Sequence, residues 1–360
     1  MNKHEQLSRV VIKGYKSILN CDLPIGNINV LIGSNGAGKS NFVSVFTWLQ
    51  SILRHEMNLY ASRKGLPTLF YDGNKTTNAI QMEFWFGDDC YSFELEMTEI
   101  NSLIFRTERF GDKSISYNGH KETKWGVPTF TPDSFGSMYD ILKKYSLRTY
   151  HFHDTSATSK MKAVHNISNC KAFLHDASNL AAFLFHLRKH YTAEYSKILE
   201  TVQLVAPYFK DFELEPLKSN QEQIALRWQQ KGCEDIFYAS QLSDGTLRFI
   251  CLATLLLQPK ELQPSTIIID EPELGLHPFA ITIFAELVKK AAVNKQLILA
   301  TQSAELLNNF TADDVVVVDR DVNGSEFKRL ETAELAEWLE DDYTLGELWN
   351  KNIFGGRFAQ

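Results

Sequence analysis

The most constraining stretch of the sequence spans residues 29–42 and reads Asn-Val-Leu-Ile-Gly-Ser-Asn-Gly-Ala-Gly-Lys-Ser-Asn-Phe. An apolar run from Ile28 to Ile32 predicts a buried strand, and a helix is predicted from Asn41 to about Ile52. Between them lies G-x-x-x-x-G-K-[ST], which in this strand–loop–helix setting is typical of a phosphate-binding loop. Its glycines let backbone N–H groups approach phosphate oxygens, and the helix N-terminus carries a partial positive charge.

We therefore expect this loop to bind the phosphates of a nucleotide. Lys39 is expected to reach the β- and γ-phosphates, and the Ser40 hydroxyl to hold Mg²⁺. The alternative is a glycine-rich turn with a chance lysine. The residues assigned here to nucleotide binding are Gly33, Ser34, Asn35, Gly36, Ala37, Gly38, Lys39, Ser40 and Asn41.

The composition of the 360 residues is that of a globular protein, with 44% hydrophobic residues and a net charge of −7. An acidic chain lacks the simplest argument for nucleic-acid binding, although a local basic stripe is compatible with it. The five scattered cysteines contain no C-x-x-C pair and indicate reduced thiols. No signal peptide and no apolar run of ~18 residues is evident, so we expect a soluble, cytoplasmic protein.

The hydrophobic pattern changes along the chain. Period-two alternation from Ala79 to Tyr117 predicts an antiparallel meander, and helical spacing from Asp176 to Phe209 predicts two amphipathic helices. From Ser240 onward helices and buried strands alternate, which indicates a parallel sheet. Further predictions are a strand at Leu7–Ile18 ending in a turn, a strand at Leu19–Leu23, a polar connection at Ser62–Asn78, loop at 118–135, a strand at Leu147–His153, strand-like alternation at Phe212–Trp228, a strand at Asp314–Val318 and a helix at Glu331–Glu340.

A second motif, Thr-Ile-Ile-Ile-Asp-Glu-Pro-Glu, begins at Thr266. Four residues with high β propensity followed by acids predict a central strand that brings carboxylates to the edge of the sheet where α/β proteins bind ligands. Asp270 is placed to hold Mg²⁺, and Glu271 to activate or orient the attacking water in phosphoryl transfer. The alternative is a buried strand that ends in a solvated acidic turn.

Two further patterns indicate phosphate contacts only in combination with the first two motifs. Leu-Ser-Asp-Gly, which includes Ser243 and Gly245, precedes an apolar helix; alone it indicates a helix N-cap, but it is also an anion-binding helix end. Leu297–Ser303 predicts a buried strand ending in polar groups, among them Gln302, that could sense a γ-phosphate. The stretch His151-x-His153-Asp154 invites a metal-site hypothesis, for which packing and hydrogen bonding are the simpler explanation.

These motifs occur in the order found in ABC-type ATPase heads. The chain resembles the RecF/SMC-like branch, within the stand-alone predicted ATPases of the AAA_21 type. Ile-Lys-Gly-Tyr-Lys-Ser from Ile12, Tyr-His-Phe-His-Asp-Thr from Tyr150 and Glu-Leu-Gly-Leu-His-Pro from Glu273 also fit that group. The resemblance covers essentially the whole chain.

The resemblance implies an α/β P-loop NTPase with a mixed, mainly parallel sheet, an antiparallel meander and a helical insertion. Residues 1–360 would form one head with an N-terminal lobe (1–165), a helical insertion with return strands (166–239), and a half carrying the signature helix, the acidic strand end and the switch (240–360).

The resemblance also implies an ATP-dependent homodimer that sandwiches two nucleotides. Ser243, Asp244 and Gly245 of one copy would face the nucleotide bound by Lys39 of the other, and the Leu274–His277 turn would lie across the interface. Lys16 would lie near the nucleotide.

The sequence departs from the family pattern at three places. Asp244 stands where related heads have glycine, and this carboxylate is unfavourable beside a γ-phosphate unless it points away. Gln302 stands where many relatives have histidine, and since an amide cannot take a proton, slow hydrolysis is expected. The family's strand-end glutamine is not evident, and Asp154 is a candidate for contact with metal-bound water.

The leading functional hypothesis is Mg²⁺-dependent ATP hydrolysis by this dimer, coupled to DNA repair, chromosome maintenance or anti-phage defence. The alternative is an ATP-gated dimerisation module that recruits or restrains a separately encoded effector such as a nuclease, with hydrolysis as the reset. DNA is a further candidate partner. An ATP-binding subunit of a transporter is disfavoured by the meander and by the Asp-Gly signature.

Overall fold

The computed structural model describes residues 6–54, 56–73, 77–111, 113–116, 146–340 and 342–356. Its centre is a mixed sheet with strand order β17-β16-β3-β15-β14-β8. The strands from β16 to β8 are parallel, and β17 pairs antiparallel with β16. Their bounds are β3 (Ile28–Ile32), β8 (Leu147–Tyr150), β14 (Thr266–Asp270), β15 (Gln296–Thr301), β16 (Val315–Asp321) and β17 (Gly324–Arg329).

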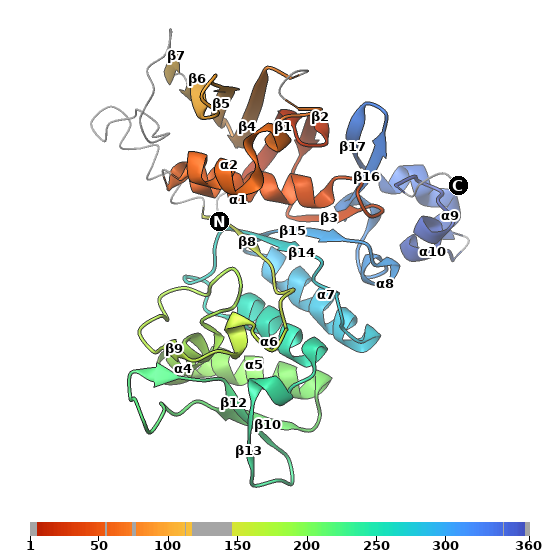
Figure 1. Cartoon of the computed structure of the whole chain (residues 1–360). Coiled ribbons are helices and arrows are strands. Elements are labelled where there is room, and N and C mark those ends of the chain that lie inside the picture. Colours follow the sequence, from red (N-terminus) through yellow and green to blue (C-terminus); the bar gives the residue numbers. More distant parts are fainter. Residues whose placement is uncertain are drawn as a thin grey trace.

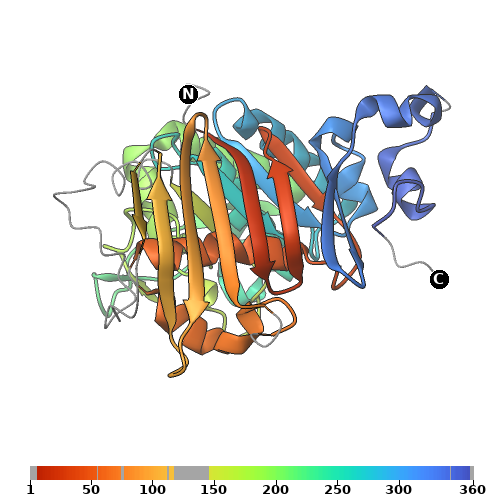
Figure 2. The same ribbon diagram turned by 90° about the horizontal axis from the view of Figure 1, so that it is seen from above.

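A second, antiparallel sheet with strand order β2-β1-β4-β5-β6-β7 lies above the central one (Figure 1). Seen from above, its strands cover helix α1 (Lys39–Leu53), which lies between the two sheets (Figure 2). The strand bounds are β1 (Leu7–Tyr15), β2 (Ile18–Pro24), β4 (Ala79–Phe86), β5 (Asp89–Met97), β6 (Leu103–Phe110) and β7 (Lys113–Ser116).

Helices and small sheets cover the other face of the central sheet (Figure 1). The helices there are α4 (Leu180–His190), α5 (Thr192–Val205), α6 (Asp244–Leu257) and α7 (Pro278–Ala292). The small sheets are β10 (Phe209–Glu213), β12 (Arg227–Gln230) and β13 (Ile236–Tyr238), and β9 (His165–Asn166) with β11 (Gln223–Ile224). Short helices elsewhere are α2 (Met57–Lys64), α8 (Ala304–Leu307), α9 (Ala336–Glu340) and α10 (Leu345–Asn350), with 3-10 turns at Leu66–Leu69, Lys160–Lys162, Ala239–Gln241, Ala312–Asp314 and Thr332–Leu335.

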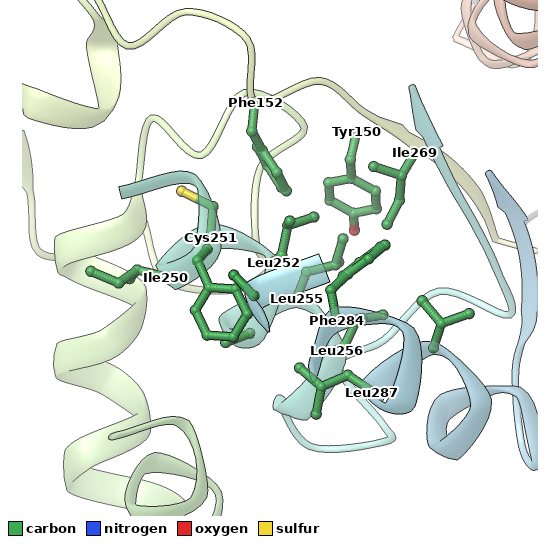
Figure 3. Close-up of a cluster of buried hydrophobic side chains, with 14 of the residues drawn as sticks. Tyr150, Phe152, Ile250, Cys251, Leu252, Leu255, Leu256, Ile269, Phe284 and Leu287 are labelled. Carbon is green, nitrogen blue, oxygen red and sulfur yellow. The ribbon is translucent and has the colours of Figure 1, made fainter. Parts of the chain in front are cut away.

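The central strands are apolar on both faces because they divide two hydrophobic cores. In β14, Ile267 and Ile269 belong to the core with α6 and α7, whereas Ile268 belongs to the core around α1. Figure 3 shows the first core, where Ile269, Tyr150 and Phe152 gather with side chains of α6 and α7. Successive side chains of a strand point to opposite faces, so an unbroken apolar run is the pattern a doubly covered sheet requires.

The fold class is as predicted, a P-loop NTPase fold with a mixed, mainly parallel sheet and an antiparallel meander. Several predicted boundaries were wrong. The stretch predicted as a polar connection at Ser62–Asn78 includes the end of α2 and a 3-10 turn, which the buried Ala61 and Leu66 anchor. The strand predicted to reach His153 ends at Tyr150, because the His151 N–H leaves the sheet and donates to His175 O.

Other differences lie toward the C-terminus and at α1. The helix predicted from Asn41 begins at Lys39. The helix predicted over Glu331–Glu340 is a 3-10 turn followed by α9, and the sequence did not predict β17 or α10. The loop predicted at 118–135 lies outside the described residues.

Candidate nucleotide-binding site

The phosphate loop connects β3 to α1 and fits only because of its glycines. A Cβ on Gly33 would lie 2.3 Å from the carbonyl oxygen of Val318, and one on Gly38, whose φ is 120°, would lie 2.2 Å from Ser325 Oγ. Gly36 has a φ of 79°, where a side chain strains the backbone. The loop backbone is therefore pressed against β16 and β17 on one side and open on the other.

Lys39 is folded inside the loop. Its side chain is buried, and Nζ donates hydrogen bonds to the carbonyl oxygens of Gly33 at 2.7 Å and Ser34 at 3.0 Å. Burial lowers the pKa of this ammonium, and the nearby carboxylates, Glu271 first, oppose that shift. The lysine thus holds the loop in shape around a site that an anion can enter.

Hydroxyl and amide groups support the loop from behind. Ser325 Oγ donates to Ser17 Oγ at 2.7 Å, and Asn41 Nδ2 donates to the same oxygen at 2.7 Å. The Ser34 N–H donates to the carbonyl oxygen of Gly356 at 2.8 Å, so the chain after α10 is also bound to the loop. Segments that are distant in sequence therefore fix the loop before any ligand arrives.

Asp270 ends β14 and is 7% exposed. Burial raises the pKa of its carboxyl group, while a hydrogen bond with the Ser40 side chain lowers it. Its Oδ1 is buried and has no hydrogen-bond partner among the described residues. A buried carboxylate oxygen without a partner is costly unless something else binds it.

These residues fit a Mg²⁺ ion. Mg²⁺ prefers oxygen ligands and is usually bound through one or two protein groups together with substrate phosphates. The Ser40 hydroxyl and the Asp270 carboxylate are adjacent oxygens; Ser40 lines the cavity over the phosphate loop, and Asp270 lies behind it, outside that lining. The unpartnered Oδ1 supplies the missing acceptor, so these two side chains would hold the ion.

Glu271 follows directly and has a strained backbone. Its φ is +46°, which is uncommon for a residue with a side chain. Its N–H donates to the carbonyl oxygen of Ala300 at 2.7 Å, and this bond to β15 helps to hold the conformation. Its Oε1 accepts a hydrogen bond from Gln302 Nε2 at 2.8 Å. The two predicted catalytic side chains therefore touch each other at the ends of neighbouring strands.

Glu273 was not assigned a role from the sequence. Its Oε1 accepts hydrogen bonds from Thr301 Oγ1 at 2.6 Å and from the Gln302 N–H at 3.2 Å, and burial raises the pKa of its carboxyl group. It thus fixes the turn that presents Gln302. The signal was the third acid of the Asp-Glu-Pro-Glu motif, together with a Thr at the end of the next strand.

Two histidines, not Asp154, contact the acidic strand end. His153 Nε2 lies 2.9 Å from the carbonyl oxygen of Asp270, and His151 Nδ1 lies 4.0 Å from Asp270 Oδ2. Burial is the main reason why the pKa of His151 is lowered to about 4, so the ring is neutral at pH 7. Asp154 instead accepts hydrogen bonds from the N–H and hydroxyl of Ser156 and lines no cavity of the site.

Lys16 supports α1. Its φ is +50°, and Nζ donates to Ser44 Oγ at 2.8 Å. Burial lowers the pKa of this ammonium to about 8. Lys16 does not line the cavity over the phosphate loop.

The signature residues begin α6. Ser243 is the N-cap, and its Oγ accepts a hydrogen bond from the Thr246 N–H at 3.2 Å. Asp244 points to Lys162, whose Nζ lies 3.8 Å from its Oδ1. A Cβ on Gly245 would lie 2.3 Å from the carbonyl oxygen of Gly275, so the helix start packs tightly on the turn after the acidic strand.

Arg248, one turn into α6, fixes this arrangement. Its guanidinium donates to the carbonyl oxygens of Phe152 at 3.2 Å, His153 at 2.9 Å and Leu274 at 2.9 Å. The sequence assigned it no role, although it lies only three residues after Gly245 of the signature. One side chain therefore connects α6 to the segments that leave β8 and β14.

A cavity of about 260 Å³ lies over the phosphate loop. The residues that line it are Asn35, Gly36, Gly38, Lys39, Ser40, Asn41, Glu271, Gln302 and Arg320. The structure thus brings together most of the predicted site and adds Arg320, which the sequence did not indicate. The signature residues are not part of this lining.

No group of three or more His, Cys, Asp or Glu side chains within the described ranges is arranged to hold a metal ion. Among the described helices, none combines the length and the hydrophobicity of a membrane-spanning segment.

The fold and the loop define a P-loop NTPase with the architecture of an SMC head. A family model described as "AAA domain, putative AbiEii toxin, Type IV TA system" matches residues 28–308, and the chain belongs to this family, AAA_21. It is an AAA-type ATPase domain, and such a P-loop domain binds nucleotide.

Solved structures support the same assignment of fold. An SMC head bound to the C-winged helix domain of ScpA has a TM-score of 0.63 and 14% identity, covering 91% of this chain and 99% of that one. The SMC head with an extended coiled coil from Pyrococcus furiosus, bound to the C-terminal domain of ScpA, gives 0.58 and 14%, covering 94% and 99%. The SMC head from Pyrococcus yayanosii gives 0.54 and 10%, with the same coverage. Comparison with curated protein sequences gives no match.

Proposed function

We propose that this protein binds ATP with Mg²⁺ at the phosphate loop and hydrolyses it slowly. The observation that carries the proposal is the hydrogen bond between Gln302 and Glu271 at the edge of a cavity that Lys39 and Ser40 also line. In this proposal the carboxylate and the amide hold the water that attacks the γ-phosphate.

In this proposal each residue has a defined task. The backbone N–H groups of the loop and Lys39 bind the β- and γ-phosphates, and α1 directs its positive N-terminal end at them. Ser40 and Asp270 would hold Mg²⁺, which would supply positive charge beside the phosphates. Glu271 accepts the proton of the attacking water, and Gln302 orients that water and the γ-phosphate through its amide.

The hydrolysis is slow for a physical reason. Gln302 Nε2 already donates to Glu271 Oε1, so the amide has to exchange this hydrogen bond before it can orient the attacking water. An amide also cannot relay the proton onward, as a histidine can. The hydrogen bond between Gln302 and Glu271 therefore favours a second candidate function, a dimerisation switch. In that switch ATP brings two heads together, and hydrolysis lets them separate.

We further propose that the site is completed by a second copy. Ser243 and Gly245 do not line their own chain's cavity, and the Ser243 side of α6 is exposed. Leu274 and Phe279, in and just after the turn that packs on Gly245, are 43% and 50% exposed. An exposed helix N-terminus bordered by apolar side chains suits burial against the nucleotide face of a partner.

The pathway we propose is DNA maintenance or anti-phage defence, with a separately encoded effector as the alternative output. The family description names a toxin of a toxin–antitoxin system, and the similar SMC heads are bound to domains of ScpA. By analogy, ATP-closed heads of this chain would present a docking surface for an effector or for DNA.

The test is Glu271→Gln, with Glu286→Gln on the exposed face of α7 as the matched control. Removing the base is expected to reduce phosphate release from ATP by about 100-fold or more while ATP binding changes little. Glu286→Gln is expected to behave as wild type. Unchanged phosphate release from Glu271→Gln would contradict the proposed chemistry.

The same variant separates the two candidate outputs. The dimer of Glu271→Gln is expected to accumulate with ATP, which sedimentation measures. If the biological activity of the protein persists in this variant, ATP-gated dimerisation is the function, and if it is lost, turnover is. Phosphate release measured with and without DNA tests the DNA branch, and a lack of both stimulation and DNA retention would contradict it.

A further inference from the structure

One positively charged side chain that lines the cavity, that of Arg320, has no role in the proposed mechanism. Arg320 lies near the end of β16 and is exposed, and its Nη1 donates to the carbonyl oxygen of Gly36 at 3.3 Å. It lines the same cavity as Lys39 and Glu271. Within the described part of the chain, no carboxylate forms an ion pair with Arg320. Its guanidinium therefore retains donors that can bind a ligand.

The strand order gives the cavity two distinct ends. β3, which leads into the phosphate loop, lies between β15 and β16. Glu271 and Gln302 follow β14 and β15 on one side, whereas Arg320 comes from β16 on the other. The phosphate loop therefore has an acidic, catalytic flank and an arginine flank.

The chemistry of ATP fixes which part of the nucleotide faces each flank. The γ-phosphate has to lie beside Glu271, because the attacking water is activated there. The α-phosphate, the ribose and the base are then directed away from Glu271, toward β16. A Cβ built on Gly36 would meet no heavy atom within 4 Å, so the space over the loop tip, beside Arg320, is open.

A guanidinium suits that position. It is planar, stacks on the flat face of a base and can donate to ribose oxygens. At 3.3 Å the bond from Nη1 to the Gly36 carbonyl oxygen is longer than a typical N–H···O hydrogen bond, so exchanging it for a bond to a ligand costs little.

We propose that Arg320 binds the nucleoside half, the base and ribose, of the nucleotide on the β16 side of the phosphate loop. This inference rests on the proposed function, because it needs a nucleotide bound with its γ-phosphate at Glu271. It makes Arg320 a specificity-determining residue that separates nucleotides from inorganic polyphosphate.

The experiment compares the binding of ATP, ADP and inorganic tripolyphosphate, each with Mg²⁺, to wild type and Arg320→Ala by calorimetry. We expect ATP and ADP to bind about tenfold more weakly to the variant, with tripolyphosphate unchanged within twofold. The KM for ATP should rise by a similar factor while kcat is retained. Equal weakening of tripolyphosphate, or unchanged ATP binding, would overturn the assignment.

Two further variants sharpen the result. Arg320→Lys keeps the charge but loses the planar group, so it is expected to remain weak for ATP; full recovery would overturn base and ribose recognition. Arg63→Ala, at an exposed arginine of α2, controls for the change in net charge and is expected to bind like wild type. If wild type itself binds neither ATP nor ADP, the proposed function fails, and this inference with it.

Discussion

The phosphate loop and the start of α6 both present a helix N-terminus, but only the first is enclosed by its own chain. Lys39 at the phosphate loop is 5% exposed, and Gly33, Gly38 and Asn41 contact β16, β17 or the β1–β2 turn. At the start of α6 the side chain of Asp244 is 61% exposed. The phosphate loop is thus enclosed by its own chain, whereas the start of α6, which we propose to face the nucleotide of a second copy, is left open.

The difference teaches where binding energy can be used. When the backbone of a site is already fixed, ligand binding loses no conformational entropy to ordering of the loop. An exposed helix N-terminus can instead bind an anion that is carried on the surface of a second protein chain. The two regions together therefore favour nucleotide binding within one chain and recognition of that nucleotide by a second chain.

The largest effect is expected from a substitution that disrupts the enclosed site at the phosphate loop. Lys39→Ala deletes a charge-assisted hydrogen bond to the phosphates and the two bonds from Nζ that shape the loop, so ATP affinity should fall by roughly 100-fold. Calorimetry with ATP and Mg²⁺ measures the change. Lys13→Ala, at an exposed lysine of β1, is the matched control and should bind ATP as wild type does. Tight ATP binding by Lys39→Ala would show that the comparison is wrong.

The next effect concerns the open site. In Gly245→Ala the new Cβ would collide with the carbonyl oxygen of Gly275, so the signature has to shift. ATP-dependent dimerisation, measured by sedimentation, should weaken by about tenfold or more, whereas ATP binding by the monomer should change little. In Gly26→Ala, where a Cβ would be 3.5 Å from the nearest atom, dimerisation should be normal. Loss of monomer binding in Gly245→Ala would mean that the two regions are not separate.

A smaller effect tests the acid of the signature. Lys162, whose side chain is 9% exposed, holds Asp244 at 3.8 Å and donates to the carbonyl oxygen of Thr155. Lys162→Met should leave the carboxylate to repel an approaching phosphate and weaken dimerisation about threefold, since a partly exposed pair contributes little. Adding Asp244→Asn should restore dimerisation. If the double variant is no better than Lys162→Met, the effect of Lys162 is structural and not electrostatic.

The smallest effect concerns the support of α1 by Lys16. Burial lowers the pKa of Lys16 to about 8 from its ordinary value near 10.5. Between these values the unfolded chain binds a proton that the folded chain does not, so this group makes stability rise with pH through that interval. The urea midpoint of wild type, relative to that of Lys16→Met, should therefore be higher at pH 10 than at pH 7.5. A difference between the two proteins that does not change with pH would contradict this.

Much of the fold could be predicted because its signals are local. The apolar run before Gly33 and the run before Asp270 both predict buried strands, and the glycines of the loop specify its backbone. Buried runs with no polar face can only be central strands of a covered sheet. The α10 helix was missed, although Thr344 and Glu347 form a capping box, because it is shorter than two full turns.

The parts of the site that escaped prediction depend on contacts between distant segments. Arg320 reaches the phosphate loop only because β16 pairs with β3, and nothing in the sequence around it specifies that pairing. His153 reaches Asp270 because β8 lies next to β14, and Asp154, its sequence neighbour, turns into its own loop. Strand order, rather than any motif, decides these contacts.

The ties made by Arg248 have a mechanical consequence. Its guanidinium joins the start of α6 to the segments that leave β8 and β14, at Phe152, His153 and Leu274. Three segments held by one stiff, planar group have little room to slide past one another. A displacement of α6 by a docking chain would therefore also displace the segments that follow β8 and β14. Asp270 ends β14, so the position of its carboxylate would change with that of α6.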